Sequence, residues 1–276
     1  MQGFLTFFET MPVWMKAGWV FVVLAFFWVL EGNYRLVDLH YSKWKHARVN
    51  LVLLLFVMLI NAVFGVATVG VFNWLEASGF GLLHLIDAPV IVELLLSVLV
   101  LDLIAQYTVH YLLHKVPVMW RLHIVHHSDK HVDATTGTRH HPLDFIVREC
   151  FALLAVVIMG MPISFYFFYR ILSVLFTYFN HANIGLPLKV DKALSYLIVT
   201  PNMHKFHHHY QLPWTDSNFG NMFSIWDRLF GTFVYGDLRD IKYGVDVADH
   251  KDDEDIKVQL GIPFDRSVKK FRALQD

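Results

Sequence analysis

Long apolar stretches constrain the fold of this 276-residue chain more than any other feature of its sequence. Three of them, at about 13–30, 51–72 and 90–110, each hold roughly twenty residues, the length that an α-helix needs to cross a ~30 Å hydrocarbon core. Hydrophobic residues make up 55% of the chain and charged residues only 17%, against ~25% charged in soluble domains. The sequence therefore predicts an all-α integral membrane protein, with the first stretch kept as an anchor helix rather than a cleaved signal.

A fourth apolar region, from about Phe145 to Tyr178, is too long for one untilted crossing. Gly160 and Pro162 lie near its middle, and these residue types break or kink helices. We expect two shorter helices that form a hairpin with both ends on one side of the membrane. Together with the three spans this makes about four membrane-embedded helical elements.

The loops between the spans predict the orientation of the chain. The loop 31–50 carries four Lys or Arg residues, whereas the loop 73–89 carries none. Positively charged loops stay in the cytoplasm, so the third span should deliver its C-terminal end to the cytoplasmic side. We expect three regions: N-terminal transmembrane helices at 1–89, a catalytic core with a cytosolic histidine-rich cap at 90–235, and a polar cytoplasmic tail at 236–276.

Histidines form a recurring pattern between the third span and the middle of the predicted cap. Residues three or four apart share one face of a helix, so each group directs its imidazoles to one place. Neutral imidazole is a common ligand of Fe, Zn, Cu and Ni, and nine such ligands are enough for two neighbouring ions. The nine candidate ligands are His110, His114, His123, His126, His127, His181, His204, His207 and His208.

Several kinds of metal protein fit this pattern poorly. A metalloprotease H-E-x-x-H motif needs a glutamate after its first histidine, but Ile124 and Lys205 stand at those positions. Haem needs only about two histidines in facing membrane helices, and a metal transporter places its ligands at the membrane midplane. A di-metal oxygenase that acts on an apolar substrate fits better. A non-redox protein, such as a zinc-dependent lipid hydrolase or a metal sensor, is the alternative.

The histidine groups and their surroundings resemble the fatty acid hydroxylase and sterol desaturase superfamily of membrane oxygenases. The resemblance covers about 90–233, and its motifs are specific to the superfamily but not to a substrate. Tyr111 stands where many members have arginine, and Thr177 stands where fatty acid 2-hydroxylases have another histidine, which favours the sterol-desaturase-like branch. The matching segments are His110–His114, His123–His127, Arg139–Pro142, His181–Asn183, His204–His208, Asn218–Gly220 and Trp226–Thr232.

The resemblance implies a membrane anchor beneath a cytosolic cap with a di-metal centre, usually di-iron. It also implies oxygen-dependent hydroxylation or desaturation of a lipid, or cleavage of an ether lipid. Zinc has no redox chemistry, so zinc in the site would be a substitute metal.

Four residues are candidates for supporting the metal ligands. Asp102 lies in a span, where ionisable groups are costly and usually functional, and it shares a helix face with His110. We expect Asp102 to orient His110 directly or through Gln106, as carboxylates do for metal-bound imidazoles; the alternative is a helix–helix hydrogen bond. The other candidates are His141, Asn183 and Asn218.

Reduction of O2 requires electrons from outside this chain. The sequence has no Gly-rich dinucleotide motif, no flavin motif and only one cysteine, Cys150. We therefore expect an external reductase with a ferredoxin or cytochrome b5-like carrier, which Lys115, Arg121 and Lys130 could attract. A net charge of -1 gives no reason to expect nucleic-acid binding. The absence of a fused cytochrome b5 motif favours a bacterial inner membrane over the endoplasmic reticulum.

Overall fold

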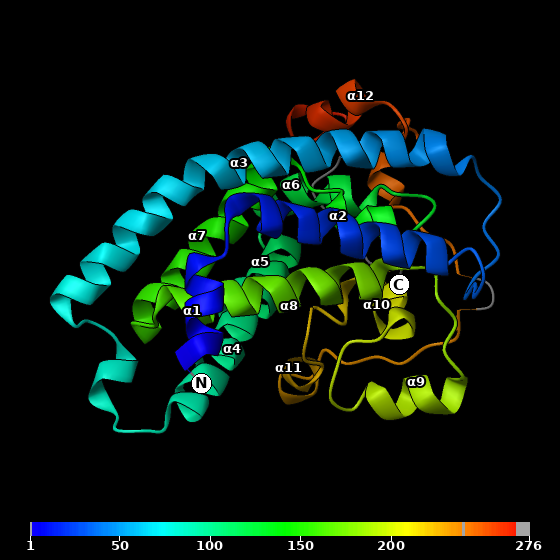
Figure 1. The fold of residues 1–276 in the computed structure, drawn as a ribbon. Coiled ribbons are helices and arrows are strands. Elements are labelled where there is room, and N and C mark those ends of the chain that lie inside the picture. The colour runs from blue at the N-terminus through cyan, green and yellow to red at the C-terminus, as the bar shows by residue number, and fades with distance from the viewer. Residues whose placement is uncertain (1, 239–240, 269–276) are drawn as a thin grey trace.

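The computed structural model describes residues 2–238 and 241–268, and within these ranges its regular secondary structure is helical, apart from two isolated β-bridges (Figure 1). The prediction of an all-α protein is confirmed. The helices are α1 (Gln2–Thr10), α2 (Val13–Leu30), α3 (Lys43–Ser78), η1 (Leu82–Leu85), α4 (Val90–Asp102), η2 (Leu103–Thr108), α5 (Val109–Lys115), α6 (Pro117–His127), η3 (Ala134–Thr138), α7 (Pro142–Met159), α8 (Ile163–His181), α9 (Leu188–Leu194), α10 (Pro201–His207), η4 (Trp214–Asp216), α11 (Ile225–Leu229), η5 (Asp246–Ala248), α12 (Ile256–Gly261) and η6 (Ile262–Phe264).

Three helical segments are long and apolar enough to cross a membrane: Val13–Leu30, Lys43–Leu85 and Val90–Lys115. The second starts earlier than its apolar pattern predicted, because α3 begins at Lys43 and runs for 36 residues, about 54 Å. One face of its polar first two turns is buried in the cap, where His46 and Asn50 are 0% exposed.

The third span continues without a break into the first histidine pair. A π-helical segment, η2, joins α4 to α5. The third span, Val90–Lys115, has 26 residues, of which α4 contributes the first 13. Asp102, the last residue of α4, therefore lies halfway along the span. The extra residue per turn in a π-helix often marks a functional site, and here it lies just before His110.

The predicted hairpin is confirmed, with α7 and α8 separated by a tight turn. Gly160 ends α7 in the left-handed conformation (φ 65°). Its backbone packs so closely on Gly81 that an added Cβ on Gly81 would lie 2.3 Å from the Gly160 Cα atom. Two glycines therefore let the hairpin turn meet the loop that joins the second and third spans.

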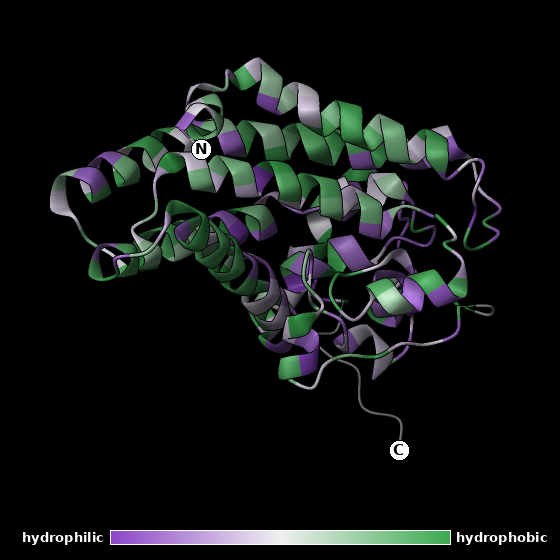
Figure 2. Cartoon of the chain, turned by 60° about the horizontal axis from the view of Figure 1, so that its bottom comes forward, coloured by the Kyte–Doolittle hydropathy of each residue, from purple (hydrophilic) through white to green (hydrophobic). Residues whose placement is uncertain are grey.

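The histidine-bearing helices form a cap at one end of the bundle, where hydrophilic residues gather (Figure 2). The described part of the tail packs onto this cap. Arg121 on α6 donates hydrogen bonds to the carbonyl oxygens of Pro263 (2.7 Å), Asp265 (2.6 Å) and Val268 (2.9 Å). Ile262 is 1% exposed and joins the apolar cluster around α6.

Candidate metal centre

All nine predicted histidine ligands converge on one buried region beneath the cap. They come from α5, α6, the last residue of α8, and α10 with the residue that follows it. Each of them is at most 6% exposed. The hairpin makes this possible, because it returns the chain to the side at which α5 ends.

The ring nitrogens fall into two adjoining groups. One group contains five histidines and the other four, and within each group the ligand atoms lie within 4.8 Å of one another. The groups meet where the stacked rings of His127 and His208 have centroids 4.7 Å apart. The first group is His110, His114, His123, His127 and His207, and the second is His126, His181, His204 and His208.

Backbone carbonyl oxygens orient four of the rings. The Nδ1 atoms of His110, His126, His181 and His207 lie 2.9, 3.2, 2.7 and 2.5 Å from carbonyl oxygens. A carbonyl oxygen can only accept, so each Nδ1 donates and the opposite nitrogen, Nε2, keeps its lone pair. The accepting carbonyls belong to Phe219, Arg139, Thr177 and Ser217, respectively.

Carboxylates orient two more rings in the same way. The Nδ1 atom of His123 lies 3.1 Å from Asp144, and that of His114 lies 3.2 Å from Asp216. A carboxylate behind a ligating imidazole sets its tautomer and increases its basicity. Neither Asp144 nor Asp216 was singled out from the sequence.

The inward-facing nitrogens approach one another too closely for neutral rings alone. The Nε2 atoms of His110 and His123 are 3.1 Å apart, and those of His126 and His181 are 3.2 Å apart. In both pairs Nδ1 carries the proton, so two lone pairs face each other. With metal–nitrogen bonds of ~2.1 Å, neighbouring octahedral ligands would lie ~3.0 Å apart. A cation between the rings removes the repulsion, and the donor set fits iron or zinc.

Buried ring nitrogens without a hydrogen-bond partner also indicate that the histidines fit a metal ion. Among the described residues, both ring nitrogens of His127 and His208 and the Nε2 atoms of His114 and His207 are buried without a hydrogen-bond partner. Burying a polar atom without a partner costs free energy, unless a metal ion uses its lone pair.

Burial also keeps the cap histidines neutral. It lowers the pKa of His123 to about 4, against the opposing effect of Asp144. Burial, with the neighbouring histidines, lowers the pKa values of His126, His127, His204 and His207 well below the usual range. Neutral imidazole is the form that binds a metal, so the centre is prepared for a cation at neutral pH.

His140 lies beside the centre, whereas the predicted candidate His141 lies apart from it. The His140 ring stacks on His126 with centroids 4.8 Å apart, and its Nδ1 lies 3.1 Å from Asp144. The His141 side chain caps α7 instead, accepting from the Leu143 N–H, and its Nε2 faces the Leu260 carbonyl oxygen at 3.3 Å. The four-residue spacing of His140 and Asp144 was the available sequence signal.

Asp102 does not contact His110 among the described residues; it forms the alternative, a helix–helix hydrogen bond, by accepting from the Tyr169 hydroxyl on α8 (3.4 Å). Its carboxylate accepts from the backbone N–H of Met222 (3.3 Å) and Phe223 (3.1 Å) and from the Trp226 indole (3.0 Å). Gln106 donates to Ser173 rather than linking Asp102 to His110. Asp102 therefore fastens the segment after Phe219, whose carbonyl oxygen orients His110.

Asn183 and Asn218 support the cap without touching an imidazole in the described contacts. Asn183 forms two hydrogen bonds with the Val37 backbone, at 2.9 and 2.7 Å. Asn218 donates to the carbonyl oxygen of Met203 on α10 (2.9 Å) and accepts from the Val234 N–H (2.8 Å). Both amides join distant stretches of backbone, which holds the ends of α8 and α10 in place.

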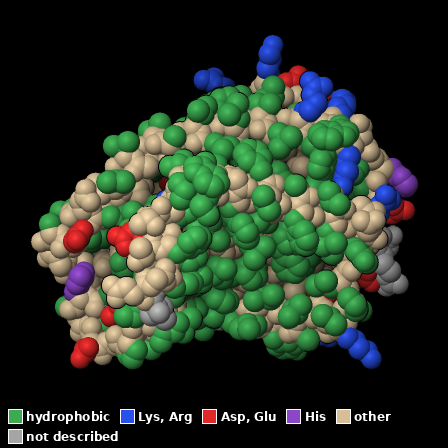
Figure 3. Space-filling view, viewed as in Figure 1, with side chains coloured by type: hydrophobic (Ala, Val, Ile, Leu, Met, Phe, Trp, Pro, Cys, Tyr) green, Lys and Arg blue, Asp and Glu red, His purple; other side chains and the backbone are tan. Residues whose placement is uncertain are grey.

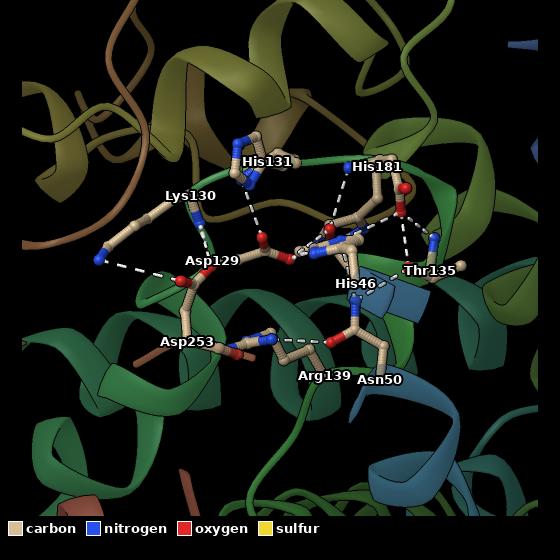
Figure 4. Close-up of polar contacts among 12 residues, drawn as sticks. His46, Asn50, Asp129, Lys130, His131, Thr135, Arg139, His181 and Asp253 are labelled. Atoms are coloured by element: carbon tan, nitrogen blue, oxygen red, sulfur yellow. Dashed lines mark hydrogen bonds and ion pairs between the residues drawn. The ribbon is translucent and has the colours of Figure 1, made fainter. Parts of the chain in front are cut away.

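A network of buried charges supports the centre from the α3 side (Figure 4). Arg139 is fully buried and donates to Asn50 (2.9 Å), to Ser128 (3.2 Å) and to the Asp253 carbonyl oxygen (2.7 Å). In the same layer His46 lies 3.5 Å from Asp129. These contacts tie α3 and the tail to the segment that follows α6.

Lys205 is a buried cation next to His204. Its Nζ donates to the carbonyl oxygens of Val132 (2.6 Å) and His181 (2.9 Å). Burial lowers its pKa to about 8. The lysine thus joins the lone histidine of α8 to the cap through backbone contacts.

The three cations expected to attract an electron carrier have partners within the chain. Lys115 donates to Asp216 (2.5 Å), and Lys130 donates to the Asp249 carbonyl oxygen (3.1 Å). Arg121 is bound to the tail, as described above. Their use as a free docking surface is therefore not supported by the structure.

Comparison with known proteins identifies the family. The sequence model described as "Fatty acid hydroxylase" matches residues 94–232, half of the chain. The chain belongs to the fatty acid hydroxylase family. This stretch contains all nine histidines and the carboxylates that orient two of them.

Curated relatives of this fatty acid hydroxylase family member carry out several lipid conversions. An ornithine lipid hydroxylase of Rhizobium tropici is 26% identical over 46% of this chain and 38% of its own length. The human alkylglycerol monooxygenase is 28% identical over 46% of this chain and 27% of its own length. A very-long-chain aldehyde decarbonylase of Oryza sativa subsp. indica is 27% identical over 78% of this chain and 87% of its own length. No solved structure matches with significance.

Proposed function

We propose that this protein is a membrane-bound, O2-dependent oxidoreductase that hydroxylates or desaturates a lipid, with two iron ions in the nine-histidine centre. The observation that carries the proposal is the pairing of unprotonated Nε2 atoms at 3.1 and 3.2 Å in two adjacent groups. Three curated relatives named as a hydroxylase, a monooxygenase and a decarbonylase of lipids support the substrate class.

The residues of the chain prepare the centre in three ways. The five-histidine group and the four-histidine group would each hold one ion. When bound, the iron pair would supply Lewis acidity and would pass electrons received from an external donor to O2. Asp144 and Asp216 keep Nδ1 protonated on His123 and His114, so that these rings present Nε2 inward. All nine rings are buried, which limits the contact of bulk water with the centre.

An apolar substrate should reach this centre from the membrane. A cavity of about 50 Å³ borders His114 on the cap side, next to Trp120, Asp216 and Val245. It is far smaller than the ~300 Å³ or more of ligand pockets, so it suits water or O2 rather than an acyl chain.

The electrons should come from a separate protein. Cys150 is the single cysteine of the chain, which leaves no set of thiolates for an iron–sulfur cluster. We propose an external reductase with a ferredoxin or cytochrome b5-like carrier that approaches the cap. The cation distribution of the loops supports a cytoplasmic cap, and we favour a bacterial inner membrane.

A zinc-dependent, non-redox lipid-modifying protein is the second candidate, because nine neutral imidazoles also suit zinc. Protein purified without added metal would separate the two by iron and zinc content and by reductant-dependent O2 uptake. The first proposal predicts about two irons per chain and O2 uptake; stoichiometric zinc with O2-independent turnover would overturn it.

The lipid can be sought by comparing extracts of cells with the wild-type chain and with His204→Ala. His84→Ala is the matched control, since His84 is exposed on η1 and lies far along the chain from the centre. We expect one lipid class to change by one oxygen or two hydrogens with wild type and His84→Ala only. The same product with His204→Ala would argue against a role of the centre.

A further inference from the structure

The segment around α11 lies beside the middle of the third span. Asp102, halfway along that span, binds the Met222 and Phe223 N–H groups and the Trp226 indole. Figure 1 places α11 below α8 and next to α4. The sequence of this region is mixed, and it was expected to belong to the water-facing cap.

Backbone N–H groups of this segment have hydrogen-bond partners within the protein, as a segment inside a bilayer requires. Irregular backbone inside a bilayer needs internal hydrogen-bond partners, because no water is there to replace them. Asp102 supplies two acceptors, and Asp227 accepts from the N–H groups of Phe219 (2.7 Å) and Gly220 (2.9 Å). Asp102 and Asp227 are both fully buried, at 0% exposure.

Large apolar side chains point outward from the same segment. Leu229 is 70% exposed and Phe230 is 54% exposed. The Phe230 ring stacks on Tyr107 of η2 with centroids 5.2 Å apart, so this face continues the surface of the third span. Such a face would be costly in water.

The neighbouring helix α9 extends the apolar face toward charged residues. Ser224, just before α11, and Arg228 on α11 both donate to the Ser195 carbonyl oxygen, at 2.7 and 3.1 Å. Leu188 and Leu197 are 66% and 61% exposed. Lys189 and Lys192 are also exposed on α9, as expected where a helix lies at the level of lipid phosphates.

We propose that α11 is inserted into the bilayer beside the third span, with Leu229 and Phe230 against acyl chains and α9 at the headgroup level. Lipid is the occupant that the structure favours, because the face adjoins the third span, where the Phe230 ring stacks on Tyr107 and where side chains such as Leu95 (56% exposed) are also apolar and exposed. Figure 3 shows hydrophobic side chains covering a broad part of the molecule on the side from which α11 is visible in Figure 1. The inserted segment is additional to the three spans and the hairpin.

The test uses the full chain in lipid bilayers with a single reporter. Cys150 is first replaced, because it is exposed, and Cys150→Ser becomes the background. Leu229→Cys and Leu197→Cys then carry an environment-sensitive fluorophore, and Lys257→Cys on α12 is the matched exposed control. Two vesicle preparations are compared, one with lipids brominated in the acyl chains and one with lipids that carry no bromine.

We expect the label at Leu229→Cys to emit in the apolar range and to lose most of its fluorescence to acyl-chain bromine. The label at Leu197→Cys should be quenched less, and that at Lys257→Cys should respond only to aqueous iodide. Iodide quenching at Leu229→Cys without bromine quenching would overturn the proposal. So would a signal that changes on dilution with unlabelled protein, because that indicates a second copy on this face. The readout does not depend on catalysis, so it stands apart from the proposed activity.

Discussion

At the level of single residues, Asp144 connects three side chains around the centre. It accepts from His123 and His140, both at 3.1 Å, and pairs with Arg148 at 3.2 Å. Without this carboxylate the two imidazoles lose the group that fixes their tautomer. Carboxylates of this kind typically change metal affinity ~10–100-fold.

We therefore expect Asp144→Ala to weaken metal binding by ~10-fold or more, with a smaller effect of Asp144→Asn, which keeps one acceptor. Metal content after dialysis at graded chelator concentration measures this. Glu76→Gln, an exposed carboxylate on α3, is the control. Equal metal retention in Asp144→Ala and wild type would contradict the role assigned to Asp144.

A second residue-scale prediction concerns pH. Burial alone would raise the pKa of Asp133, but hydrogen bonds from His46, Thr135 and Tyr41 hold it below the usual range. A carboxyl group whose pKa is lowered by folding stabilises the folded protein at pH values above ~3.9, the pKa of the group in the unfolded chain. This contribution is lost as the pH falls toward the pKa that the group has in the folded protein.

Asp133→Asn should thus lower the free energy of unfolding by about 3 kcal/mol at pH 7, as expected for breaking a buried ion-paired group. The difference should be similar at pH 5 and should shrink below about pH 4. Thermal unfolding of chelator-treated wild type and variant at each pH measures it. A difference that grows on acidification would show that Asp133 is protonated in the folded protein.

At the level of elements, the hairpin turn depends on backbone conformation. Gly160 has φ 65°, and a Cβ there would lie 2.2 Å from the Phe80 carbonyl oxygen. Gly160→Ala should therefore destabilise the protein by ~1–3 kcal/mol or more, since strain and overlap add. Gly65→Ala in α3 meets open space and should be neutral or slightly stabilising, by up to ~1 kcal/mol.

Thermal unfolding in detergent and the yield of monodisperse protein compare these two variants. Both glycines lie in apolar surroundings, so a general effect of alanine on membrane insertion would appear in both. Loss of stability in Gly65→Ala alone would contradict the close approach of the hairpin turn to Gly81.

Asp102 gives a second prediction at this scale. Asp102→Ala leaves two backbone N–H groups and an indole N–H without their acceptor, at ~1–3 kcal/mol each. Ser97→Ala, at a buried position five residues earlier on the same helix, removes a hydroxyl that has no partner among the described residues and should not destabilise. If both variants unfold alike, Asp102 does not hold the α11 segment.

The elements show where sequence reasoning succeeded and where it stopped. Apolar length predicted the spans, and Gly160 with Pro162 predicted the hairpin, because both signals are local. The π-helical segment and the early start of α3 were missed, since they depend on contacts with residues far along the chain. His46 and Asn50, for example, are helical and buried only because η3 packs against them.

At the level of the whole molecule, the centre also combines features that the local sequence predicts with features that depend on distant contacts. Helical spacing brought the nine histidines together as candidates. Their orientation depends on carbonyl oxygens, such as those of Phe219 and Ser217, which every residue type carries and no motif reveals. The contacts of Asp102 and His141 differ from the expected ones for a similar reason, because helix-face geometry gives direction but not the partner that tertiary packing supplies.

The centre should also hold the cap together. Nine buried imidazoles from four elements face one another, so an ion in each group would replace lone-pair repulsion with bonds that join α5, α6, α8 and α10. A ligand bound only to the folded state stabilises it by ~4 kcal/mol at a thousand times its Kd. The bundle has its own apolar cluster around α4, α7 and α8, which contains no metal ligand.

Chelation should therefore lower the unfolding temperature of the cap while most of the helix content, measured by circular dichroism, remains. Adding Fe²⁺ without oxygen should restore the original temperature. In His127→Ala, which removes a ligand at the junction of the two groups, chelation should change the unfolding temperature less. An unfolding temperature that does not respond to chelator in wild-type protein with measured metal would show that the four elements are held by packing alone.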